Sequence, residues 1–491
     1  MSAGRASLLF AALLIVVAAV GCGRGHGSGP GGGGSGGAGS GGGGGSGADG
    51  GSGADGGGSG NFGGPGPWGT DNVAYGSADG IREAPVVGIS TDESQNLWVA
   101  TNAALYLLQP GARSFRRFDA RDGLHLAENP LTYCDSSFAG GDKACPILGA
   151  ATSAGISEIT GGGPGEVFVG YYGDDEGNGD WSDAARHSGK LDRVRLSTNG
   201  LAVDRFDLVS STTAQFWHNR TVQRLLYDHF LHPHELYVGT NHGVDRLLPD
   251  KYRAPNRGEW FLAATQDWLS DHLHPQVCYH RACDASESGL MLGDWKGLAL
   301  GQDGNLWVGG RWTGGEIRWT GALHDWLSRP GEQIYALAFG DGYVSGKCNA
   351  DGFCNQPVFL VPQEGDVISV QAVALTPDGR AWFASGRTTN SDQPRGLAVW
   401  EGKNFRYYDP RHDLGMAEGD VRDLVALPDG RLALAGASSG VTLWDPKSGA
   451  HVAITGLPDP HVLRMELDTM VSPPALHIAT YGGAVSLRRL P

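Results

Sequence analysis

The feature that most constrains this chain is one phrase of short β-prone runs that recurs along its body. Clear copies are "ESQNLWVATNAALYLL" at 93–108, "HELYVGTNHGVDRLL" at 234–248 and "DGNLWVGGRWTGGEIRW" at 303–319. Each copy has a turn, a run rich in β-branched and aromatic residues, a break of small residues and a second alternating run, as paired strands do. A chain that repeats such a unit buries its core by placing the units side by side.

The repeat predicts an all-β fold, a single β-propeller of seven or eight four-stranded blades. We count eight candidate blades, which start near residues 86, 152, 220, 295, 332, 370, 420 and 461. The last unit stops after its third strand, whereas "DNVAYGSADGI" at 71–81 has the shape of an outermost strand. We therefore expect a strand near 71–76 to complete the last blade and to close the ring, which hides a strand edge.

The segment "TDESQNLWVATNAALYLLQPGARSFRRFDARDGL" at 91–124 resembles the two-component regulator propeller repeat over nearly its full length. The resemblance extends over about 72–491 and implies the propeller fold. Relatives of this kind are sensor ectodomains and solitary exported propellers with many partners, so the resemblance implies binding and leaves the ligand open. "DGNLWV" also resembles repeats of streptogramin lyases, propellers with a histidine and a divalent metal near the channel; only His242 suits such a position.

The N-terminus predicts export and lipid anchoring. Residues 1–22 have an early arginine, an apolar run too short to span a bilayer and "AVGC", which resembles a lipoprotein signal with Cys22 as the lipidation site. An ordinary secretory signal is the alternative. Residues 23–66 are more than half glycine and predict a disordered tether of roughly 35–40 Å. Residues 67–491 form the expected propeller domain, on the outer membrane or the cell surface.

Charge and cysteine usage support an exported binding protein. The net charge of −16 and the lack of a basic run argue against a nucleic-acid partner. Six cysteines beyond Cys22 form three close pairs, which we expect to be disulfides in surface loops. The pairs are Cys134/Cys145, Cys278/Cys283 and Cys348/Cys354.

Strand order predicts which end of the ring carries each loop. With strands a to d running from the innermost to the outermost, the a–b and c–d turns share one end, and the b–c and d–a connections share the other. The cysteine-bearing insertions and the loop at 173–190 are assigned to b–c or d–a connections, so we expect that end to bind a ligand. The candidate ligand-binding residues there are Asn102, Tyr171, Tyr172, Asn241, His242, Arg311, Trp312, Arg387, Ser438 and Tyr481.

The histidines do not predict a composite metal site. His232 and His234 fall in an a–b turn, whereas His242 follows strand b at the opposite end, roughly 15 Å away, so they cannot share one ion. A calcium site at Asp174, Asp175 and Asp180 is the weaker alternative to a solvated acidic loop.

These features predict a membrane-tethered, non-catalytic and monomeric propeller with no cofactor. Its partner would be an envelope protein, a peptide or a glycan. The alternatives are a cell-envelope lyase or hydrolase at the same end of the ring, and a scaffold that holds other envelope proteins. No GxSxG, HExxH or phosphate-binding glycine loop supports catalysis.

Overall fold

A computed structural model describes most of the chain from Asn72 to Leu490. The gaps in this description are 125, 127–154, 173–189, 208–220, 232–234, 241–243, 253–267, 274–275, 279–289, 292–294, 311–313, 320–332, 340–341, 348–357, 361–369, 386–395 and 402–404. The signal segment and the glycine-rich segment therefore lie outside the described residues. No described helix is long and apolar enough to cross a membrane.

The described strands form seven antiparallel sheets that are the blades of a β-propeller, plus one small extra sheet. The strands of each blade are given from a to d. Blade one contains β2 (Val86–Thr91), β3 (Leu97–Thr101), β4 (Ala104–Leu108) and β5 (Arg116–Phe118), and blade two contains β6 (Ile156–Gly161), β7 (Glu166–Tyr171), β8 (Lys190–Ser197) and β9 (Gly200–Asp207). Blade three contains β10 (Val222–Asp228), β11 (Glu235–Thr240), β12 (Val244–Tyr252) and β13 (Trp268–Leu273).

Blades four to six follow in chain order. Blade four contains β16 (Gly297–Leu300), β17 (Leu306–Gly309), β18 (Gly314–Trp319) and β19 (Gln333–Phe339), with β20 (Gly342–Lys347) as a fifth strand. Blade five contains β22 (Val370–Leu375), β23 (Ala381–Ser385), β24 (Gly396–Trp400) and β25 (Phe405–Tyr408). Blade six contains β26 (Val421–Ala426), β27 (Leu432–Gly436), β28 (Val441–Trp444) and β29 (His451–Ile454).

The seventh blade joins the two ends of the described chain. It consists of β30 (Val462–Asp468), β31 (Ala475–Thr480), β32 (Gly483–Leu487) and, as its outermost strand, β1 (Val73–Tyr75). Ala74 pairs with Val485 in this antiparallel contact. The small extra sheet contains β14 (Gln276–Cys278), β15 (Leu290–Met291) and β21 (Val358–Leu360), and two short 3-10 helices are η1 (Ser77–Asp79) and η2 (Ala120–Asp122).

The expectation of eight blades is wrong, because the described strands make seven. The candidate blade near 332 has no innermost strand of its own. Its first run is β19, which pairs with β18 as the fourth strand of blade four, with Glu316 opposite Ala338. Its second run is β20, a fifth strand at the edge of the same sheet.

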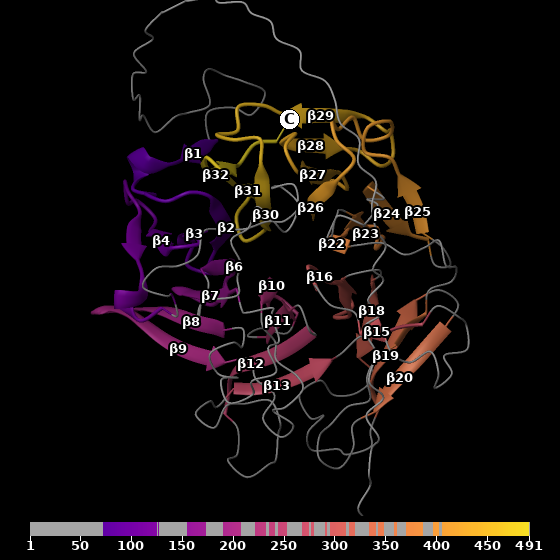
Figure 1. Cartoon of the computed structure of the whole chain (residues 1–491), viewed down its shortest axis with the longest axis horizontal. Coiled ribbons are helices and arrows are strands. Elements are labelled where there is room, and N and C mark those ends of the chain that lie inside the picture. Colours follow the sequence, from indigo (N-terminus) through magenta and orange to yellow (C-terminus); the bar gives the residue numbers. More distant parts are fainter. Residues whose placement is uncertain are drawn as a thin grey trace, which may run out of the picture. The chain divides into compact units, whose positions relative to one another are not determined.

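The innermost strands surround a central channel. They contact one another in the order β2, β6, β10, β16, β22, β26 and β30, and β30 contacts β2 again. Figure 1 shows these strands nearest the centre, with the other strands of each sheet further out. The second strand of a blade is buried on both faces, as in β3, β11 and β31, because each sheet is covered by a neighbouring sheet on either side.

The packing between blades uses the repeat's own residues. Trp382 of blade five lies in one core cluster with Leu424 and Leu432 of blade six, and its ring is 5.5 Å from that of Trp444. The indole Nε1 of Trp98 donates to Asp92 in the preceding turn at 2.9 Å. The recurrent tryptophan therefore joins the a–b turn to the core between blades.

The expectation that all long connections lie at the b–c end is also wrong. Residues 253–267 join β12 to β13 and residues 320–332 join β18 to β19, so both are c–d connections at the end of the a–b turns. The extra strand β20 also ends there, so the connection with Cys348 and Cys354 leaves from the a–b end.

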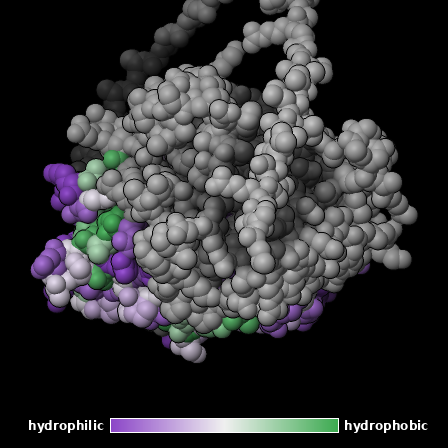
Figure 2. Space-filling view, turned by 90° about the horizontal axis from the view of Figure 1, so that it is seen from below, coloured by the Kyte–Doolittle hydropathy of each residue, from purple (hydrophilic) through white to green (hydrophobic). Residues whose placement is uncertain are grey.

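In Figure 2 the described residues that reach the surface on one side are mostly hydrophilic, with smaller hydrophobic areas between them.

Candidate functional site

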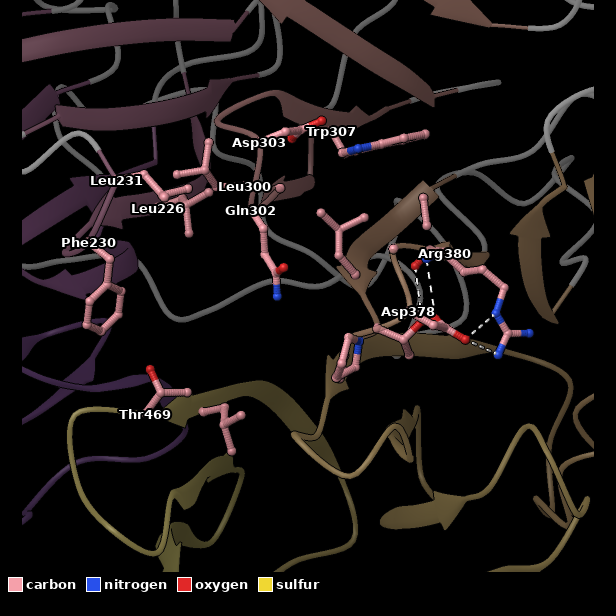
Figure 3. A pocket seen from close by; sticks show the side chains of 18 of the residues that line it. Leu226, Phe230, Leu231, Leu300, Gln302, Asp303, Trp307, Asp378, Arg380 and Thr469 are labelled. Atoms are coloured by element: carbon pink, nitrogen blue, oxygen red, sulfur yellow. Dashed lines mark hydrogen bonds and ion pairs between the residues drawn. The ribbon is translucent and has the colours of Figure 1, made fainter.

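A pocket of about 1260 Å³ lies among the a–b turns of blades three to seven. We call it the mouth pocket, and one residue from each of these turns marks it: Phe230, Gln302, Asp378, Pro428 and Thr469. In Figure 3 the side chain of Gln302 extends into the open middle of the pocket, between Leu231 and Asp378. The site is therefore built from short turns at one end of the channel.

The inner wall of the mouth pocket is apolar. Residues near the ends of the innermost strands supply it, because these strands meet around the channel. These residues are Leu226, Leu300, Leu375, Ala426 and Leu467. Trp307 and Trp400 add aromatic surface from the second and third strands of blades four and five.

The turn of blade three gives the pocket an exposed hydrophobic edge. Phe230 is 65% exposed and Leu231 is 44% exposed. The carboxylate of Asp228 accepts hydrogen bonds from the backbone N–H groups of both residues, at 2.9 and 2.8 Å. The same turn places Nδ1 of His229 at 3.3 Å from the carboxylate of Glu93. The turn therefore has a defined shape that presents two apolar side chains to solvent.

Polar groups hold the turns of blades four and five. Nδ2 of Asn305 donates to Asp303 at 2.7 Å and to Glu316 at 3.2 Å, so one amide links two carboxylates. In the next blade Arg380 forms an ion pair with Asp378 at 2.7 Å. Hydrogen bonds from this guanidinium and from Thr376 lower the pKa of Asp378 to about 2. Asp378 is therefore an anion that already has a cationic partner.

Buried ion pairs cross the channel beneath the mouth pocket. A second cavity of about 350 Å³ shares Leu226 and Leu300 with the mouth pocket. Its lining includes Glu158 and Arg464, which form an ion pair between blades two and seven. Arg224 of blade three contacts Asp423 of blade six at 3.2 Å. The two blades of each pair are not neighbours in the ring, so these ion pairs join strands that do not contact each other through a shared blade interface.

Glu466 is an acidic residue of β30 that lines the same second cavity. The hydroxyl of Ser90 donates to its carboxyl at 2.6 Å, and the backbone N–H of Gly161 donates to Ser90 at 2.6 Å. Burial raises the pKa of Glu466 to about 8; the hydrogen bond from Ser90 opposes this increase, and the charges of Asp468 and Glu158 add to it. The carboxyl is therefore largely protonated near neutral pH.

The residues predicted at the b–c end have mixed environments where the structure describes them. Asn102 is buried, and its side chain donates to the carbonyl of Ile156 at 3.1 Å. Tyr171 is fully buried, and its hydroxyl donates to Asp192 at 2.5 Å. Both side chains are buried and bonded to other strands, so their contacts in the described structure are structural.

Three further predicted residues are more accessible. Tyr172 is half-buried, and its backbone N–H donates to the carbonyl of Gly155 at 3.1 Å. Ser438 is exposed, and its backbone N–H donates to Glu418 at 2.7 Å. Tyr481 is half-buried with its ring 5.4 Å from that of His461. The three residues follow the second strands of blades two, six and seven, so they lie at the b–c end, away from the mouth pocket.

Many predicted ligand contacts have no described side chain, and the predictions about them stay predictions. The ligand-binding candidates in this group are Asn241, His242, Arg311, Trp312 and Arg387. The lipidation site Cys22 and the calcium candidates Asp174, Asp175 and Asp180 also lie outside the described residues. Among the residues that the structure describes, no group of three His, Cys, Asp or Glu side chains is arranged to hold a metal ion.

The three expected disulfides likewise fall on the gaps in the described chain. Five of the six cysteines lie outside the described residues: Cys134, Cys145, Cys283, Cys348 and Cys354. The sixth, Cys278, ends β14, and only its backbone is described. Each pair therefore has at least one undescribed member, and the bonds Cys134–Cys145, Cys278–Cys283 and Cys348–Cys354 stay predictions. The structure changes only the end of the ring from which the third connection leaves.

Sequence reasoning missed the mouth pocket because it judged an end of the ring by loop length. The a–b turns are short, but five of them meet around the channel, and strand spacing cannot show how wide that opening is. One signal was available. The turn of blade three reads "HFLHPH" where the equivalent turns of blades five and six read "PDG", so it carries two large apolar residues in place of small polar ones.

No protein-family model and no curated protein matches the chain. Two of the similar solved structures are the crystal structure of the mitotic checkpoint complex and YCF48 bound to a D1 peptide. The first has 12% identity and a TM-score of 0.42, with 85% of this chain and 93% of that chain covered. The second has 11% identity and a TM-score of 0.41, with 83% and 94% covered. The strand pairing itself shows the propeller fold.

Proposed function

We propose that this protein is an exported, lipid-anchored β-propeller that binds a peptide or protein partner in the mouth pocket without catalysis. The observation that carries the proposal is the pocket itself, about 1260 Å³ of largely apolar space built by five turns of a rigid ring. Concave apolar sites with a few placed polar groups are the usual form of binding sites. The exposed Phe230 and Leu231 extend this surface to the rim.

The lipid anchor, the envelope location and the kinship with two-component regulator propellers are part of this proposal. They are supported by "AVGC" before residue 23, by the glycine-rich segment and by the repeat phrases. A tether of roughly 35–40 Å would let the pocket reach partners beyond the lipid headgroups. The lyase alternative depends on His242, and no observation on the described residues favours it.

A blocking variant tests the binding site. Gln302 is exposed and extends into the pocket, so Gln302→Trp should obstruct the middle of the pocket without disturbing a buried contact. Ser94→Trp is the matched control, because Ser94 is exposed in the equivalent turn of blade one, outside the pocket. A displayed library of random heptapeptides is selected against the wild-type full chain, and the enriched peptides are then measured against all three proteins.

We expect enriched peptides to bind the wild type and Ser94→Trp equally and to bind Gln302→Trp at least about tenfold more weakly, a loss of about 1.4 kcal/mol. If no peptide is enriched, or if the blocked variant binds as well as the control, the mouth pocket is not the binding site and the proposal is overturned.

A further inference from the structure

We infer that the occupant of the mouth pocket is a segment of peptide chain that carries lysine or arginine among apolar residues. Its basic side chain lies beside Asp303 and Trp307, and its apolar residues cover Phe230 and Leu231. This inference deepens the proposed function and rests on it.

The lining of the mouth pocket is acidic. Four carboxylates and one guanidinium contribute to it: Asp228, Asp303, Glu316, Asp378 and Arg380. The guanidinium is committed to Asp378 at 2.7 Å. This excess of carboxylates over guanidinium groups makes the lining favourable for a cationic ligand and unfavourable for an anionic one, because like charges brought together in a partly desolvated site repel.

Asp303 differs from its equivalents in the neighbouring blades. The same Asp-Gly turn occurs in blades five and six, where Asp378 and Asp429 accept from an arginine two residues later, at 2.9 and 2.8 Å. In blade four that position is Asn305, whose amide donates at 2.7 Å. An amide orients a carboxylate without neutralising its charge. Asp303 is also exposed, so a ligand can reach it.

Aromatic surface lies on the same hairpin. Trp307 is on β17, which follows the turn with Asp303 directly, and both residues line the pocket. Figure 3 shows the two side chains along the same edge of the pocket. A cation held by a carboxylate and placed on a tryptophan face gains from both contacts. The edge therefore suits an ammonium or guanidinium group.

The size and rim of the pocket favour a chain segment over a small molecule. A volume of about 1260 Å³ exceeds the upper range of roughly 1,000 Å³ for typical small-molecule sites. Phe230 and Leu231 are two of the three exposed large hydrophobic residues in the described part of the chain. Because both side chains lie at the rim, a partner that covers them must extend beyond the pocket, as a peptide segment does.

Three labelled hexapeptides test the inference by fluorescence anisotropy. They have the same apolar residues and differ in two positions, which are lysine, glutamine or glutamate. Each is titrated with the wild-type full chain and with Asp303→Asn, Asp429→Asn and Gln302→Trp. Asp429→Asn is the matched control, because it removes the same charge from the same type of turn outside the pocket lining. The titrations are repeated at about 0.05 M and about 0.5 M salt.

We expect the lysine peptide to bind about tenfold more tightly than the glutamate peptide at low salt, with a smaller difference at high salt. Asp303→Asn should weaken the lysine peptide about threefold and leave the glutamine peptide unchanged, whereas Asp429→Asn changes neither. Equal binding of the three peptides, if abolished by Gln302→Trp, overturns the cationic ligand and leaves the binding site intact. Tighter binding of the glutamate peptide also overturns it. If none of the three peptides binds the wild type more tightly than it binds Gln302→Trp, the proposed function is overturned as well.

Discussion

At the scale of single residues, the channel combines charged and neutral acids in one small space. Asp423 is fully buried and accepts hydrogen bonds from the backbone N–H groups of Leu424 and Met465, at 3.0 and 2.6 Å, besides its contact with Arg224. A buried carboxylate without such partners costs several kcal/mol, so this set of contacts is what permits a charge there. Glu466 accepts fewer such hydrogen bonds, and a bound proton neutralises its carboxyl instead.

The pKa of Glu466 predicts a pH dependence of stability. Because the folded-state pKa of about 8 is above the ordinary value of 4.5, the folded state holds a proton that the unfolded state releases. The stabilising contribution is therefore complete below pH about 4.5 and is lost as the pH rises to about 8. Glu466→Gln, which keeps the neutral form, should gain about 3.5 kcal/mol in unfolding free energy over the wild type between pH 5 and pH 8.

Denaturant unfolding at a series of pH values measures this difference. Glu401→Gln, which removes an exposed carboxyl with 54% side-chain exposure, is the control. A stability difference between Glu466→Gln and the wild type that does not change over this pH range would show that Glu466 stays ionised in the folded protein.

At the scale of elements, β1 depends on one side chain as well as on its strand pairing. Asn72 is 2% exposed, and its carbonyl oxygen accepts from the backbone N–H groups of Arg488 and Arg489 at 3.0 and 3.3 Å. Its amide donates to the carbonyl of Arg489 at 3.3 Å. One asparagine therefore fixes the start of β1 against the residues that follow β32.

Asn72→Ala should lower the free energy of unfolding by about 2 kcal/mol, because it removes the three hydrogen bonds that the buried side chain makes to the backbone at 488 and 489. Hydrogen exchange should increase at 484–487, where β32 would lose its outer neighbour. Asn199→Ala, in an exposed turn, is the control. Unchanged exchange in β32 would mean that β1 contributes little to holding the seventh blade.

Strand patterns in the sequence could place some of these elements but not all of them. The repeat phrases with a tryptophan located β3, β17 and β23 in register. In β3 and β23 the indole of that tryptophan donates to the preceding turn. The run at 333–339 has no such phrase, and alternation alone does not say whether a strand is innermost or fourth. Misplacing that one strand gave an extra blade and reversed the end to which the following connection was assigned.

At the scale of the whole molecule, the proposed anchor determines where the binding site works. Cys22→Ser should remove lipid attachment, because a hydroxyl cannot replace the thiolate that forms the thioether. In a bacterium that processes lipoproteins, the wild-type protein should label with fatty acid and enter the detergent phase, whereas the variant should do neither. The binding of a mouth-pocket peptide should stay within about twofold in the variant, since the pocket is distant in sequence from the anchor. Detergent-phase partition of the variant would refute lipidation at this cysteine.

The sequence by itself determined the fold class and the hairpins of the repeat units. Both follow from local chemistry, since alternating runs, small-residue breaks and Asp-Gly turns specify hairpins wherever they occur. The tertiary structure alone decided the number of blades, the ion pairs across the channel and the position of the mouth pocket. These features depend on residues such as Glu158 and Arg464, far apart in the chain, which meet only because the ring brings their strands together. Except for the pairing of β1 with β32, pairing within a blade is local, whereas the width of the ring and the contents of its channel are properties of all the blades at once.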